Sequence, residues 1–157
     1  MKGFNISLLF CVLMGCLACH QNKEQVYMGA LDGHWNKKKS QKFQFEISDA
    51  TQPKNIIFVV RNNNQYPYSN IRFFVKLENL KNKTSIQDTL NYEIAAPDGQ
   101  WLGSGFGDTK EIFFQYKVNY QFPANGTYAI SVLHAMRKDD LPGIEDFGIK
   151  IEPANQN

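Results

Sequence analysis

Cysteine is missing from almost the entire chain. All three cysteines of the 157 residues, Cys11, Cys16 and Cys19, lie close to the N-terminus. A fold built from the rest of the chain therefore contains no disulfide, and apolar packing must supply its stability.

Motifs for catalysis, metals and cofactors are also missing. The histidines, His20, His34 and His134, show none of the spacings that zinc or an activated nucleophile requires. The chain has neither a Gly-x-Ser-x-Gly elbow nor a phosphate-binding loop. We therefore predict no catalytic residue, no metal, no cofactor and no small-molecule substrate. His134 shares strand parity with Ile130 and Val132, so we expect it to be a hydrogen-bonded histidine at the core edge.

A strong charge of either sign is the third absence. Lysine and arginine number 17 against 15 acidic residues, which gives a net charge of +2. Domains that bind nucleic acid are usually far more basic, with cations clustered on one face. We therefore exclude nucleic acid as a partner.

The chain also lacks an apolar run long enough to cross a bilayer as a helix, which takes about 20 residues. It does carry an uncharged, mostly apolar stretch over residues 4–17, and this contains Leu13-Met14-Gly15-Cys16. A lysine before such a stretch and a small residue at its end are typical of an export signal. A cysteine directly after the small residue is what a bacterial lipoprotein requires. We predict a lipoprotein signal peptide over residues 1–15.

Two cysteines compete for the lipid. Cys16 has Leu13 three positions before it and a glycine directly before it, whereas Cys19 lies closer to the start of the polar chain. We favour Cys16 and keep Cys19 as the alternative; an ordinary secretory signal with incidental cysteines also stays open. Acyl chains would hold the protein at a bilayer, and residues 16–36 are then expected to form the lipidated N-terminus and a polar tether.

Apolar and polar residues alternate through much of residues 37–153. A period of two is typical of half-buried strands, and a continuous apolar run predicts a strand buried on both faces. Strands are expected around residues 43–47, 56–60, 71–77, 89–94, 112–118, 128–132 and 147–151. No segment has a convincing helical period. We predict one all-β domain, an antiparallel β-sandwich of immunoglobulin-like or jelly-roll-like type, followed by a tail over residues 154–157.

Aromatic residues also occur where loops are predicted. Trp35, Trp101, Tyr66 and Tyr68 would lie in or beside the loops of the sandwich. Loop aromatics can anchor a protein partner or stack on a glycan, and they can equally fold back to cap the sandwich. We take these four residues, with Arg137, as candidate contacts for a partner or a glycan.

Paired carboxylates offer a weaker, enzymatic alternative. Asp139-Asp140 and Glu145-Asp146 could be imagined as the acid and base of a glycoside hydrolase. Neighbouring residues of a strand point to opposite faces, and carboxylates in turns are usually solvated. We therefore do not expect an enzyme.

Several blocks of the chain together resemble the gliding motility lipoprotein family GldH. They occur in the expected order between residues 35 and 152, and the block at 136–149 is the most specific. The blocks are Arg61-Asn62, Tyr66-Pro67-Tyr68-Ser69-Asn70, Asp88-Thr89, residues 98–105, Phe122 with Gly126-Thr127-Tyr128, and residues 136–149. Two small departures are Phe147, where an aliphatic residue is expected, and Met14 in the signal.

This resemblance implies an envelope lipoprotein of the Bacteroidota. It implies a role in surface gliding and an association with the type IX secretion system, with no catalytic residues. We therefore expect a lipid-anchored, non-enzymatic protein that contacts the bilayer through its acyl chains and contacts other gliding or secretion proteins through its fold. We favour the outer membrane, without choosing between its periplasmic face and the surface. A surface glycan-binding module remains the alternative.

Overall fold

The computed structural model describes residues 24–154. The predicted signal peptide at 1–15, both lipidation candidates, Cys16 and Cys19, and the last three residues of the predicted tail lie outside this range.

The described residues form ten strands and no helix. No helix among them could therefore span a membrane. The strands are β1 (Gln25–Ala30), β2 (His34–Asn36), β3 (Gln41–Ile47), β4 (Lys54–Asn62), β5 (Asn70–Asn79), β6 (Ser85–Glu93), β7 (Lys110–Tyr120), β8 (Gly126–His134), β9 (Asp140–Pro142) and β10 (Ile144–Pro153).

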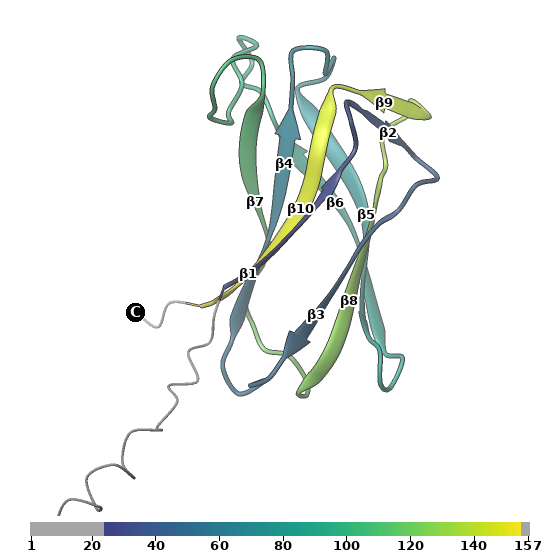
Figure 1. Ribbon diagram of the computed structural model, residues 1–157, viewed down its shortest axis with the longest axis vertical. Helices are drawn as coiled ribbons and strands as arrows, with labels where there is room; N and C mark the ends of the chain where they lie inside the picture. Colours follow the sequence, from purple (N-terminus) through teal and green to yellow (C-terminus); the bar gives the residue numbers. More distant parts are fainter. Residues whose placement is uncertain (1–23, 155–157) are drawn as a thin grey trace, which may run out of the picture.

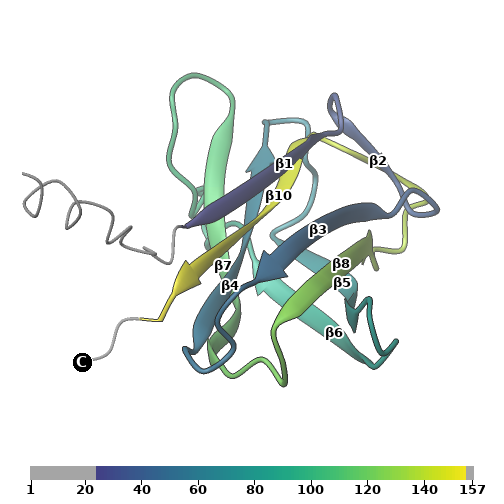
Figure 2. The same cartoon turned by 60° about the horizontal axis from the view of Figure 1, so that its bottom comes forward.

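Two antiparallel sheets pack face to face, which confirms the predicted β-sandwich (Figure 1). One sheet has the strand order β1-β10-β4-β7, and the other has the order β3-β8-β5-β6. β2 and β9 form a short two-stranded ribbon. Figure 2 shows it beyond the C-terminal end of β1 and the N-terminal end of β10. Every strand pair is antiparallel.

Alternating side chains place one face of each sheet in the core. In β3, Phe43, Phe45 and Ile47 are buried, and the polar residues between them are exposed. β4 differs because every residue at positions 56–60 is buried, as the continuous apolar run predicts. β4 lies between β10 and β7, in the interior of its sheet and not at an edge.

Aromatic rings fill the middle of the core. Phe147 has its ring centroid 5.1 Å from that of Trp35, 5.4 Å from Phe58 and 5.3 Å from Phe73. All four side chains are completely buried. Burial of one such side chain contributes about 2–3 kcal/mol, so this cluster takes the place of the missing disulfides.

The fold begins earlier in the chain than the sequence predicts. Residues 25–36 were expected to be tether, but Gln25–Ala30 pairs with β10 and His34–Asn36 pairs with β9. β1 is an edge strand held largely by its backbone pairing, so it needs no strict apolar alternation. Three-residue strands such as β2 are too short to show any period. The predicted boundary at residue 37 is therefore wrong for this segment.

The two ends of the sandwich differ. Gln25 of β1, Pro153 of β10 and Tyr120 of β7 lie at one end, which we call the terminal end. The loops at positions 63–69, 94–109 and 135–139, which join β4 to β5, β6 to β7 and β8 to β9, lie at the opposite end, called the loop end (Figure 1).

Candidate functional site

Three of the predicted contact residues meet at the loop end. The ring centroid of Tyr66 is 5.8 Å from that of Tyr68 and 6.4 Å from that of Trp101. These residues come from two different loops, so the fold assembles a cluster that is dispersed in the sequence. The three residues differ in exposure.

Tyr66 is a structural member of this cluster. Only 3% of its surface is exposed, and its hydroxyl donates a hydrogen bond of 2.7 Å to the carbonyl of Asn70. Burial raises its pKa far above that of a free tyrosine. The sequence predicts Tyr66 as a contact for a partner, and this is wrong because the ring is used to close the core beneath the loop.

Trp101 is half-buried and joins neighbouring loops. Its indole N–H donates to Asn64 Oδ1 over 3.0 Å, and the amide of Asn64 donates to Asp108 Oδ1 over 3.0 Å. Part of the ring thus caps the sandwich, while the rest faces solvent at the loop end.

Tyr68 and Arg137 line one small hollow. This hollow has a volume of about 270 Å³ and is also lined by Asn70, Arg72 and Met136. Arg137 is exposed and Tyr68 is half-buried, so both present groups to solvent. A cationic fork beside an aromatic ring is a common composition at protein interfaces.

Trp35 lies elsewhere and has no exposed surface. Its ring packs 5.9 Å from Phe73 and 5.6 Å from His134, and its N–H donates to the carbonyl of Lys39 over 2.8 Å. The prediction that Trp35 contacts a partner is therefore wrong. The sequence places Trp35 in or beside a loop, whereas in the structure it is the inward residue of β2.

Phe106 at the loop end is fully exposed, which the sequence did not reveal. It lies at the tip of a glycine-rich loop, and the ammonium of Lys110 donates to the carbonyls of Gly105 and Gly107 over 3.0 and 2.9 Å. These bonds hold the tip in a defined shape. A sequence does not show whether a glycine-rich loop is braced in this way.

A polar cleft of about 560 Å³ lies beside Phe106. Within it, Arg61 Nε donates to Glu111 over 2.7 Å, and Arg61 Nη1 lies 3.5 Å from Asp146. The hydrogen bond to Glu111 raises the pKa of the guanidinium. Arg61 thus joins β4, β7 and β10 at the point where their loops begin.

The four carboxylates considered as an enzymatic alternative each contact a different residue. Asp139 forms an ion pair with Lys37, and Asp140 lies 3.1 Å from the His34 ring. The hydrogen bond from Lys37 lowers the pKa of Asp139, whereas a catalytic acid needs a raised pKa. Glu145 accepts a hydrogen bond from Asn63, and Asp146 faces the cation described above. Within residues 24–154, no group of His, Cys, Asp or Glu could hold a metal.

His134 is part of the core beneath the β2–β9 ribbon. Burial lowers the pKa of its imidazole. Backbone groups of Trp35 and Asp139 lie near the ring, but neither ring nitrogen makes a hydrogen bond of normal geometry. The Trp35 ring also packs edge-on against the imidazole, with its centroid 5.6 Å away.

Comparison with known proteins identifies the family. A model of the GldH lipoprotein family matches residues 24–151, which is nearly the whole sandwich. The gliding motility lipoprotein GldH homolog of Christiangramia forsetii is 37% identical over 98% of both chains. The gliding motility lipoprotein GldH of Flavobacterium johnsoniae is 31% identical over 96% of both chains.

Among solved structures, the Yersinia pseudotuberculosis-derived mitogen covers 87% of this chain and 90% of its own. Its identity of 6% and TM-score of 0.37 are too low to carry a functional comparison. The family match and the two relatives, in contrast, span the fold and name the same family that the sequence resembles. The chain belongs to the GldH lipoprotein family.

Proposed function

We propose that this chain is a lipid-anchored lipoprotein of the cell envelope that supports gliding motility and the associated type IX secretion machinery. It acts by contact and not by catalysis. Its family carries the proposal, because relatives named for gliding motility match almost its full length.

The geometry suggests how such a protein would be oriented. The chain enters the fold at Gln25, nine residues after Cys16, and nine extended residues reach about 30 Å. β7 spans 11 residues, so the loop end lies roughly 37 Å from the terminal end. Acyl chains at Cys16 would hold the terminal end near a bilayer, while the loop end is free to face another protein.

The proposed contact surface consists of Tyr68, Trp101, Phe106 and Arg137 at the loop end. Aromatic rings and arginine dominate the binding energy of protein interfaces when a partner shields them from water. Phe106 supplies exposed apolar area on a braced loop, so little conformational entropy is lost when it is covered.

Glycan binding through the predicted aromatic set has less support. Trp35 and Tyr66 are buried, so the four residues do not form one open platform for a sugar. The contact role at the loop end is therefore preferred to the glycan role for these residues.

Membrane fractionation and co-purification test the proposal. The full chain should fractionate with the outer membrane and co-purify with other motility or secretion proteins. Cys16→Ser should release it from the membrane, whereas the control Cys19→Ser should not. If only Cys19→Ser released the protein from the membrane, Cys19 and not Cys16 would be the lipidated residue. Absence of any motility or secretion protein from the purified material would refute the proposed role.

A further inference from the structure

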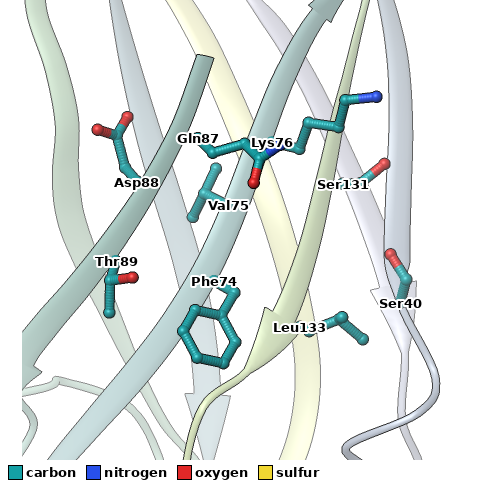
Figure 3. Close-up of a pocket in the computed structure, with 9 residues that line it drawn as sticks. All are labelled: Ser40, Phe74, Val75, Lys76, Gln87, Asp88, Thr89, Ser131 and Leu133. Carbon is teal, nitrogen blue, oxygen red and sulfur yellow. The ribbon is translucent and has the colours of Figure 1, made fainter. Parts of the chain in front are cut away.

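A hollow of about 360 Å³ lies on the outer face of the sheet β3-β8-β5-β6, away from the loop end and its contact residues. Figure 3 shows the side chains that line it. Its volume is within the range of small-ligand sites, which begins at about 300 Å³.

Two rows of paired residues form the floor. In one row, Phe74 of β5 pairs with Leu133 of β8 and with Thr89 of β6. In the next row, Lys76 pairs with Ser131 and Gln87. Thr89 and Ser131 are shorter than the neighbouring Phe74 and Lys76, which leaves space above the sheet beside the longer side chains.

Phe74 gives the hollow an aromatic wall. Phe74 is 54% exposed, although outward positions of a solvated sheet face are usually polar. Leu133 lies beside it (Figure 3). A ligand with an apolar face could therefore cover the ring and gain apolar burial.

The polar groups around this ring are neutral or already paired. The Lys76 ammonium is bound to the Glu78 carboxylate at 3.0 Å. The Asp88 carboxylate accepts from the Tyr116 hydroxyl at 2.8 Å and from Lys117 at 3.0 Å, and Figure 3 shows it turned away from Phe74. Both charges therefore already have a partner within the protein.

Four neutral side chains remain for hydrogen bonding. They are the hydroxyls of Ser40, Thr89 and Ser131 and the amide of Gln87. Apart from a long contact of 3.5 Å from Ser40 to the Gln41 carbonyl, none of them makes a side-chain hydrogen bond within residues 24–154. Hydroxyls and amides both donate and accept, so they suit a ligand whose own groups do the same.

We propose that this hollow binds a neutral saccharide. A sugar ring has an apolar C–H face for Phe74 and a rim of hydroxyls for Ser131, Thr89 and Gln87. The cation among the lining residues, Lys76, already has an acidic partner, which disfavours an anionic ligand, and a purely apolar ligand would leave these polar groups without partners. The site is separate from the loop end, so this binding does not depend on the proposed role in gliding.

Calorimetric titration of the full chain in detergent tests the site. The probes are neutral oligosaccharides, with β-1,3- and β-1,4-linked hexoses and N-acetylhexosamines as separate sets. At least one set should bind, and Phe74→Ala should weaken that binding by about tenfold or more. Thr89→Val, which removes a hydroxyl and keeps the shape, should also weaken it.

Phe113→Ala is the matched control. Phe113 is 55% exposed on the outer face of the opposite sheet, so it equals Phe74 in type and exposure. It should leave binding within twofold of the wild type. The proposal is overturned if no neutral set binds at millimolar concentration or if the two phenylalanine variants weaken binding equally. Tighter, salt-sensitive binding of a uronic-acid oligosaccharide would also overturn it.

Discussion

The substitution Trp35→Ala should lower the free energy of unfolding by more than the position of Trp35 in a three-residue strand suggests. The side chain has no exposed surface and packs against Phe73, His134 and Phe147. Truncation removes its apolar burial and leaves a cavity, which for buried Trp or Phe costs about 3–5 kcal/mol. The lost hydrogen bond to the Lys39 carbonyl adds little, because Lys39 is exposed and its carbonyl can accept a hydrogen bond from water instead.

A loss of about 4 kcal/mol is a large part of the 5–15 kcal/mol typical of a domain. With a urea dependence of about 2 kcal/mol per molar, the midpoint should fall by about 2 M. Far-UV circular dichroism should follow the unfolding, because the substitution removes one of two tryptophans. Trp101→Ala, which truncates a half-buried ring, should cost only about 1–2 kcal/mol. A loss below 1 kcal/mol for Trp35→Ala would refute the docking of β2 in the core.

Two further predictions concern pH and backbone geometry. Because burial lowers the pKa of His134 from 6.5, the unfolded chain takes up a proton first. The free energy of unfolding should therefore fall as pH drops below about 6.5. Urea titrations at several pH values measure this dependence. His134→Gln should reduce it, whereas the exposed control His34→Gln should retain it. Gly143→Ala should cost at least about 2 kcal/mol in thermal unfolding, because φ is +80° and a Cβ would collide with the Tyr66 backbone. Gly99→Ala, at φ +88° with open space around it, should cost about 1 kcal/mol; equal losses would contradict the close packing at Gly143.

The parts of the fold that the sequence predicts are those with long periodic patterns. Phe43, Phe45 and Ile47 alternate over a full strand, and the run at 56–60 matches a strand covered on both faces. β1, β2 and β9 could not be predicted in this way. β1 depends on backbone pairing at an edge, and β2 and β9 are too short to carry a period.

The candidate contacts divide along similar physical lines. A sequence shows that Tyr66, Tyr68 and Trp101 are aromatic, but only the packing shows that Tyr66 closes the core. Phe106 could not be identified because its exposure depends on how Lys110 braces the loop. The lipid anchor has a local signature, so the sequence predicts it without reference to the fold.

Colony spreading of a gliding strain tests the central claim that the loop end makes the contacts needed for motility. The chromosomal gene for this protein would be deleted from the strain. The strain would then produce the wild-type protein, the double variant Tyr68→Ala/Phe106→Ala or the control Phe113→Ala, each at the same level in the membrane. We predict that wild type and control restore spreading and that the loop-end variant does not. Full spreading by the loop-end variant, or loss of spreading in the control, would contradict the account.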